Sequence, residues 1–340
     1  RALPYAAPGM ATRPRAELGK LLDEITPPGV SKFMFTLGGA DANENAVKLA
    51  RGYTGKHKIL TRYRSYHGAS AGAMALTGDP RRWPWEPTLM PGVVHFLDPY
   101  RYRSTFHRNN PDIPEAEFTQ DYLNHLEEII QYEGPETIAA ILMESVTGTN
   151  GIIIPPAGYM QGVRALCDKY GILMIADEVM SGFGRTGKWF AVDHWNVTPD
   201  LMTMAKGLTS AYAPLGAVGM KPEIADAYKD TVYQGGLTYT AHPISLAAAI
   251  ANIQVMRDVI VQVSADPEFK DHVTTVFNND VDNSSGLGVG TDREYFETHE
   301  GKIVDAKGVK GRYVRAYTNG SSLSALNCWQ ELEVYALPAS

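Results

Sequence analysis

In the longer, N-terminal part of the chain, short apolar runs alternate with segments of helical spacing. Ile138 to Met143 and Ile172 to Ala176 are continuous apolar runs, which is the pattern of strands buried on both faces. Between them, Tyr159 to Tyr170 carries apolar residues at helical spacing and is followed by Gly171, a residue type that commonly ends a helix. Leu201 to Ala205 predicts a further short strand. This alternation predicts the α/β class, with a mostly parallel sheet flanked by helices.

The pattern changes after a last predicted helix, the Ala-rich stretch from Ala241 to Met256. Beyond it, short β-type runs are separated by Asn, Asp, Gly and Ser, which is typical of an all-β sandwich. These runs are Val259–Val263, Val273–Phe277, Tyr313–Tyr317 and Glu331–Tyr335. We therefore predict two domains, residues 1–256 and residues 257–340.

Composition narrows the choice of partners. The chain has 340 residues and a formal net charge of -7 without a basic run, which argues against nucleic acid and anionic membrane surfaces. No apolar stretch is long enough to span a bilayer, and the start, Arg1-Ala-Leu-Pro4, is not a secretory signal. We expect a cytoplasmic chain and, because it does not begin with Met, a fragment. Cys167 and Cys328 form no metal or redox motif.

Two acids follow a predicted buried strand in Ile175-Ala-Asp-Glu-Val179. Because side chains alternate along a strand, Asp177 and Val179 face the same way. Ligands of open α/β sheets lie beyond the carboxyl ends of the strands. An Asp at such a position can pair with the protonated ring nitrogen of a pyridine cofactor, and Val179 can pack on its ring. Taken alone, the motif fits a capping or salt-bridged acid better.

Lys206 follows the apolar run 201–205, precedes Gly207 and lies 29 residues after Asp177. A lysine at a strand end can form a Schiff base with a cofactor aldehyde and can later move a proton between substrate and cofactor. Most lysines are solvated surface groups, so this interpretation depends on the spacing from Asp177.

Three further motifs have a functional and a purely structural interpretation. Gly39 and Ala40 precede a helical pattern whose free N–H groups suit a phosphate, although a plain turn before a helix explains the motif better when it is taken alone. Tyr66 and His67 precede Gly68, and the tyrosine can stack on a cofactor ring or simply lie in the core. The hydroxyl of Thr238, in Gly236 to Pro243, can donate to a phosphate or merely belong to a turn.

In their order and spacing, these five motifs resemble the class III (omega) aminotransferases of fold type I, over about residues 3–256. Glu144, in Met143-Glu-Ser-Val146, resembles the acid that precedes a Gly-containing loop in that family. The segment Arg81-Arg-Trp-Pro-Trp85 looks most similar to taurine–pyruvate and β-alanine-type transaminases.

The resemblance implies pyridoxal 5'-phosphate (PLP) as cofactor. Lys206 would form the internal aldimine, and Asp177 would pair with the ring nitrogen. The cofactor-binding set that it implies is Gly39, Ala40, Tyr66, His67, Glu144, Asp177, Val179, Lys206 and Thr238. Thr238 would come from a neighbouring subunit, which implies a homodimer. The implied reaction moves an amino group from an amine or ω-amino acid to a keto acid such as pyruvate.

Both ends depart from the family pattern. We do not recognise the family's N-terminal segment, its small C-terminal domain, or the arginine that commonly receives a substrate carboxylate. Residues 257–340 instead resemble the later half of a discoidin-like, galactose-binding β-sandwich, which implies a carbohydrate partner and a fused or misassembled chain. Two alternatives therefore stay open: an inactive or weakly active fusion fragment that binds carbohydrate, and a racemase or aminomutase that uses the same cofactor.

Overall fold

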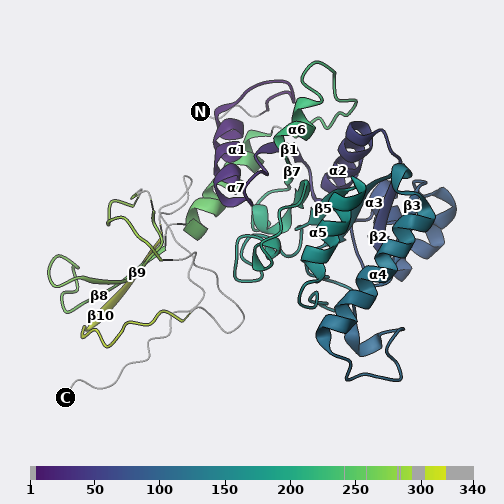
Figure 1. Ribbon diagram of the computed structural model, residues 1–340. Helices are drawn as coiled ribbons and strands as arrows, with labels where there is room; N and C mark the ends of the chain where they lie inside the picture. The colour runs from purple at the N-terminus through teal and green to yellow at the C-terminus, as the bar shows by residue number, and fades with distance from the viewer. Residues whose placement is uncertain are drawn as a thin grey trace. The chain divides into compact units, whose positions relative to one another are not determined.

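The computed structural model of the chain describes residues 5–240, 242–257, 259–281, 283, 285–292 and 303–318. The chain divides into two compact units, Arg1–Leu246 and Ala247–Ser340. The first unit holds a seven-stranded sheet and the second a three-stranded antiparallel sheet (Figure 1).

The large sheet has the strand order β1-β7-β6-β5-β4-β2-β3. Strands β2 to β6 run parallel, whereas β7 is antiparallel to both β6 and β1. Consequently β1 runs in the same direction as β2 to β6, and six carboxyl ends meet at one edge. The bounds are β1 (Lys32–Thr36), β2 (Lys58–Arg62), β3 (Val93–Phe96), β4 (Ile138–Glu144), β5 (Leu173–Asp177), β6 (Leu201–Met204) and β7 (Gly216–Met220).

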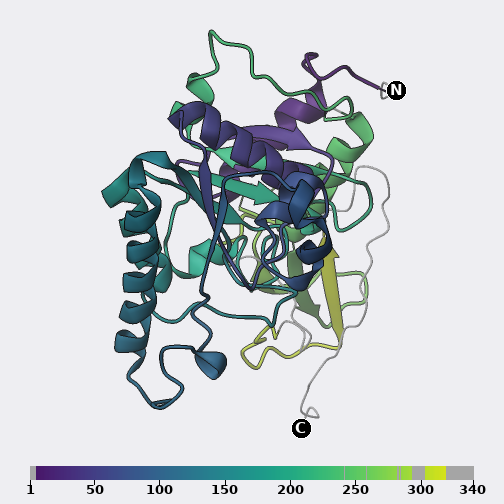
Figure 2. The same ribbon diagram turned by 90° about the vertical axis from the view of Figure 1, so that its right-hand side faces the viewer.

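Helices cover both faces of this sheet. Helix α2 packs across its middle strands, while α4 and α5 pack together on the opposite face (Figures 1 and 2). The α-helices are α1 (Arg13–Ile25), α2 (Gly39–Thr54), α3 (Ala71–Leu76), α4 (Glu115–Glu133), α5 (Tyr159–Tyr170), α6 (Pro222–Asp226) and α7 (Pro243–Arg257). Short 3-10 helices are η1 (Pro80–Thr88), η2 (Arg101–Arg103), η3 (Pro135–Thr137), η4 (Ala191–His194) and η5 (Lys206–Leu208).

The core beneath α2 explains why this helix lies so close to the strands. Its buried apolar side chains are three alanines together with Val47 and Leu49, and they pack on Leu142, Ile175 and Leu201 of three neighbouring strands. Burial of each such Leu or Ile side chain contributes roughly 1.5–3 kcal/mol. The small alanines let the helix, and therefore its N-terminus, come close to the strand ends.

The predicted α/β fold of the first unit is confirmed. Strands β4, β5 and β6 lie where apolar runs predicted them, and α5 has the predicted bounds. Gly171 caps α5 in the left-handed conformation with φ 61, as expected of a helix-ending glycine. Strand β5 extends to Asp177, so the predicted functional acid is the last residue of a strand.

The second unit contains β8 (Val259–Ser264), β9 (Thr274–Asn278) and β10 (Tyr313–Thr318), in the order β10-β8-β9. Three of the four predicted strands are therefore confirmed, and the fourth, Glu331–Tyr335, lies outside the described residues. A small core forms around Val259, Val261 and Phe277. The division between the units lies within α7, so the domain boundary near Met256 stays a prediction, as does the discoidin-like character.

Over the described ranges, no helix is both long and apolar enough to cross a membrane. The same ranges hold no cluster of three or more His, Cys, Asp or Glu side chains that could bind a metal ion.

Candidate functional site

Most of the predicted site residues lie at the carboxyl edge of the large sheet. Glu144 and Asp177 are the last residues of β4 and β5 and are direct partners across the two strands. Asp177 in turn pairs with Thr203 of β6, and Lys206 follows two residues after that strand ends. Gly39 starts α2 shortly after the carboxyl end of β1. The topology thus brings four separate segments to one edge, where ligands of such sheets bind.

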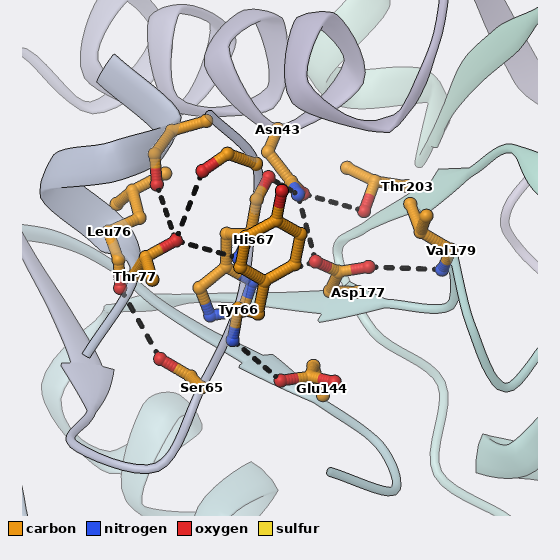
Figure 3. Close-up of polar contacts among 12 residues, drawn as sticks. Asn43, Ser65, Tyr66, His67, Leu76, Thr77, Glu144, Asp177, Val179 and Thr203 are labelled. Carbon is orange, nitrogen blue, oxygen red and sulfur yellow. Dashed lines mark hydrogen bonds and ion pairs between the residues drawn. The ribbon is translucent and has the colours of Figure 1, made fainter. Parts of the chain in front are cut away.

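The carboxylate of Asp177 is buried and held by three donors. Its Oδ2 accepts a hydrogen bond from Asn43 Nδ2 at 2.8 Å and lies 2.7 Å from His67 Nδ1 (Figure 3). Its Oδ1 accepts from the backbone N–H of Val179 at 3.0 Å. The side chain is 3 % exposed. Bonds to a carboxylate are among the stronger hydrogen bonds in proteins, so the orientation of Asp177 is well defined.

His67 connects Asp177 to the end of β2. Its Nε2 lies 3.2 Å from Thr61 Oγ1, and its backbone N–H donates to Thr77 Oγ1 at 2.9 Å. The imidazole is therefore enclosed by the acid on one side and a hydroxyl on the other. His67 thus contacts the predicted cofactor partner, Asp177, directly.

Tyr66 is held at its backbone and covered on one ring face. Its N–H donates to Glu144 Oε1 at 3.0 Å. The guanidinium of Arg81 lies over its ring, 4.6 Å from the centroid. Only the other face of the ring remains for stacking on a ligand.

Glu144 binds two backbone N–H groups. Its Oε1 accepts from Tyr66, and its Oε2 accepts from Gly148 at 2.7 Å. Burial raises the pKa of this carboxyl above its ordinary value. The acid therefore fixes the Tyr66 segment and the loop after β4. Its predicted contact with a cofactor stays a prediction.

The start of α2 has free N–H groups, and it lies so close to neighbouring segments that only small residues fit there. Its N-cap, Gly38, supplies no side-chain cap, so the first-turn N–H groups point outward without intrahelical partners. A Cβ added to Gly39 would lie 2.8 Å from Val179 Cγ1. A Cβ added to Gly68, which has φ +134, would lie 2.5 Å from the Cβ of Ala40. Small residues thus allow the start of α2, whose free N–H groups suit an anion, to lie close to the strand ends.

Lys206 adopts a left-handed backbone conformation with φ 45 at the first position of η5. This region costs a non-glycine residue of order 1 kcal/mol or more, and such strain often marks functional positions. The side chain is exposed, and within the described residues we find no hydrogen bond or ion pair to its ammonium group. The amine is thus available to a ligand.

Thr238 belongs to the segment between α6 and α7. It is exposed, and its carbonyl accepts a hydrogen bond from the hydroxyl of Tyr5 at 3.3 Å. In the part of the chain that the structure describes, no hydrogen bond joins it to Gly39, Ala40 or Asp177.

The structure therefore places the buried Asp177 and the exposed Lys206 at the ends of adjacent strands, close to the start of α2 in the topology. Residues 4–273 match the family model of the class III aminotransferases. The chain belongs to the class III aminotransferase family.

Solved class III structures share the fold. The taurine:2-oxoglutarate aminotransferase of Bifidobacterium kashiwanohense, solved with PLP and glutamate, is 50 % identical, with a TM-score of 0.70 over 74 % of this chain and 56 % of that one. An (S)-enantioselective omega-transaminase from Thermomicrobium roseum is 40 % identical, with a TM-score of 0.71 over 75 % and 58 %. The predicted fold type I architecture is therefore confirmed.

Curated relatives show the same partial coverage. The gamma aminobutyrate transaminase 3 of tomato chloroplasts (Solanum lycopersicum) is 40 % identical over 276 residues, which are 77 % of this chain and 52 % of the relative. The chain spans about half the length of the curated relatives it matches.

In this class III aminotransferase, the sequence motifs did not single out two polar residues of the site. Asn43 is 1 % exposed and Thr203 is fully buried, and the hydroxyl of Thr203 donates to Asn43 Oδ1 at 2.8 Å. One signal was available for Asn43, because it lies next to Ala42 on the helical pattern's apolar face. A polar residue on such a face needs a buried partner. No comparable signal marks Thr203, since threonine is common in strands.

Two hollows of the first unit lie away from Lys206 and Asp177. One, of about 400 Å³, lies between α1 and β1, and the other, of about 340 Å³, lies beyond β2 and β3. Neither contains the predicted cofactor contacts, which instead line the open edge of the sheet.

Proposed function

We propose that the chain binds PLP at the carboxyl edge of the large sheet. There it would move an amino group from an amine or ω-amino acid to a keto acid such as pyruvate. The observation that carries this proposal is the juxtaposition of Asp177 and Lys206 at the ends of neighbouring strands. Family membership supports it independently.

The residues present fit this cofactor. Outward N–H groups at the start of α2 suit a phosphate, and the absence of a Cβ on Gly39 lets the side chain of Val179 lie close beside that helix start. The buried carboxylate of Asp177 suits a protonated pyridine nitrogen. The uncovered face of Tyr66 suits a ring.

When bound, PLP supplies an aldehyde that joins amines and a ring that withdraws electrons from the substrate carbon. Asp177 would keep the proton on the ring nitrogen, which makes the ring a better electron acceptor. Lys206 would anchor the cofactor through its amine. Once the amino substrate displaces that amine, Lys206 would take the proton from the substrate carbon and return it to the cofactor carbon. Val179 and Tyr66 would hold the ring between them.

For the donor, we propose an ω-amino acid of the taurine or β-alanine type. The guanidinium of Arg81 lies over the Tyr66 ring and is ion-paired only loosely, 3.5 Å from Asp79 Oδ2, with about half of its side chain exposed. A partly exposed guanidinium near the proposed site can receive a sulfonate or carboxylate. The 50 % identity to a taurine:2-oxoglutarate aminotransferase supports this donor class.

The proposal is tested by incubating the purified chain with PLP, an amino donor and pyruvate. We expect an absorbance band of protein-bound cofactor that is missing in Lys206→Ala, and alanine formed from pyruvate. Racemisation or amino-group migration without alanine would indicate the other PLP reactions instead. Saturable galactose binding without any bound PLP would favour the carbohydrate-binding alternative for residues 257–340, which remains a prediction.

We further propose a homodimer in which Thr238 reaches the cofactor phosphate of the other copy. Thr238 is exposed, and among the described residues of its own chain it makes no hydrogen bond to Gly39, Ala40 or Asp177. A mixture of Lys206→Ala and Thr238→Ala chains tests this arrangement, because a mixed dimer has one site with both residues intact. We expect the mixture to regain cofactor affinity and turnover at low PLP. If mixing restores nothing beyond the sum of the two variants, Thr238 does not act across an interface.

A further inference from the structure

One buried amide joins the segments that form the site. Asn43 Nδ2 donates to Asp177 Oδ2 and to the carbonyl oxygen of His67, each at 2.8 Å. Its Oδ1 accepts from the hydroxyl of Thr203, also at 2.8 Å (Figure 3). Asn43 therefore connects α2 with the end of β5, with the segment after β2, and with β6 just before the lysine.

The surroundings allow only one orientation of this amide. If it were reversed, its oxygen would face the carboxylate of Asp177 and the carbonyl of His67, which are both acceptors. Its nitrogen would then face Thr203. Two buried acceptor pairs without a proton between them would cost several kcal/mol by the usual penalty for unmade buried hydrogen bonds. Thr203 reinforces the observed orientation by donating to the oxygen.

The donors leave the two oxygens of Asp177 unequal. Oδ2 has two donors, Asn43 and His67, whereas Oδ1 has one, the N–H of Val179. A carboxylate has about four acceptor positions, two on each oxygen, so the open position is on Oδ1. Oδ1 is also the oxygen next to Val179, whose side chain is proposed to pack on the ring.

We infer that Asn43 is a positioning residue that turns Asp177 so that Oδ1 receives the N–H of the cofactor ring, and that Thr203 holds Asn43 in this role. The inference rests on the proposed function. Loss of the Asn43 amide frees Oδ2 and lets the carboxylate rotate about its remaining contacts. The ring nitrogen then holds its proton less strongly.

Asn45 provides a matched control on the same helix. It is 3 % exposed, its Nδ2 donates to the carbonyl of Asp41 at 2.7 Å, and its Oδ1 accepts from the hydroxyl of Tyr233 at 2.8 Å. It has no hydrogen bond to Asp177 within the described residues. Replacing it removes a buried amide of the same kind without touching the proposed function of Asn43.

The experiment uses the full chain loaded with PLP labelled with ¹⁵N in the ring, and follows the ring nitrogen by NMR as the pH is varied. In Asn43→Ala, we expect the midpoint for loss of the ring proton to fall by about one pH unit, and the PLP dissociation constant to rise about tenfold. Thr203→Val, which removes the hydroxyl, lowers the midpoint and raises the dissociation constant in the same way. Thr203→Ser, which keeps a hydroxyl, has the wild-type midpoint and dissociation constant. Asn45→Ala lowers the unfolding temperature but keeps the wild-type midpoint.

The outcomes separate the two proposals. A wild-type chain that binds no PLP at Lys206 overturns the proposed function and this inference together. A wild-type chain that binds PLP, with an Asn43→Ala midpoint and dissociation constant equal to wild type, overturns this inference alone. If Asn43→Ala does not fold, the pair Thr203→Val and Thr203→Ser decides in its place, and equal midpoints in these two variants overturn the inference.

Discussion

At the scale of single residues, the account depends on Asp177 being a carboxylate. Asp177→Asn keeps the shape of the side chain but removes its charge. The NH2 group of the new amide would face either the N–H of Val179 or the donors of Asn43 and His67, so two donors would oppose each other. We expect alanine formation to slow by at least about a hundredfold, because a neutral amide stabilises a protonated ring poorly. The measurement is kcat at saturating PLP. The exposed Asp112→Asn removes the same charge elsewhere and should retain wild-type turnover.

Glu144 provides a prediction about pH. Burial raises the pKa of this carboxyl, whose ordinary value is 4.5, so the folded chain binds its proton more tightly than the unfolded chain does. The stability that this bound proton contributes is fully present below the pKa of the unfolded chain, and it is lost as pH rises through the raised pKa of the folded chain. In urea unfolding, the free energy of wild type minus that of Glu144→Gln should therefore decrease from about pH 4.5 toward neutral pH. A difference that is constant over this range would contradict the burial argument.

The sequence motifs singled out Asp177 and Lys206 as candidates but did not single out the residues that contact Asp177. Asp177 and Lys206 were candidates because each follows an apolar run and because their order and spacing resemble those of the family. Asn43 and Thr203 are ordinary residues for a helix and a strand, and they lie 160 positions apart. Their pairing depends on how α2 crosses the sheet, which no local pattern specifies.

At the scale of elements, small residues set how closely the segments approach. Gly68 combines φ +134 with a site where an added Cβ would lie 2.5 Å from that of Ala40 and 2.8 Å from that of Ala73. We expect Gly68→Ala to lower the free energy of unfolding by more than about 2 kcal/mol and to weaken PLP binding, because both strain and overlap act on the start of α2. Urea unfolding and PLP titration measure the two effects.

Gly19 is the control for that substitution. It lies inside α1, and nothing lies within 4 Å of its added Cβ. Gly19→Ala should be neutral or stabilising by up to about 1 kcal/mol, since alanine favours a helix over glycine. An equal loss of unfolding free energy in Gly68→Ala and Gly19→Ala would show that the close contacts at Gly68 do not cause the destabilisation.

Continuous apolar runs predicted β4 and β5, which are almost entirely buried, whereas helical spacing followed by a glycine predicted α5. The direction of β7 was not predictable in the same way. Its sequence, Gly216-Ala-Val-Gly-Met220, is as apolar as that of a parallel strand, yet it runs antiparallel to both neighbours. Strand direction follows from the path of the connecting chain, and local composition carries little information about it.

At the scale of the whole molecule, the two units have separate cores, one beneath α2 and one around Val261 and Phe277. All predicted cofactor contacts lie in the first unit. We expect calorimetry to show two thermal unfolding transitions, and we expect PLP to raise the midpoint temperature of only one of them. At a hundred times the dissociation constant, the ligand would stabilise that transition by about 2.7 kcal/mol. A single transition, or equal shifts of both, would contradict the division into independent units.

The family model reaches residue 273, beyond the predicted boundary near Met256 and through β8. The aminotransferase match therefore includes the first strand of the β-rich segment. The placement of the boundary remains our proposal, and the two-transition experiment addresses it without cutting the chain.

The central claim is that the amine of Lys206 holds the cofactor, and it can be tested directly. The chain is loaded with PLP, reduced with borohydride, digested and analysed by peptide mass spectrometry. The account predicts a pyridoxyl group on the peptide containing Lys206, at close to one per chain, and its loss in Lys206→Ala. A label spread over surface lysines, or the same label in Lys206→Ala, would contradict it.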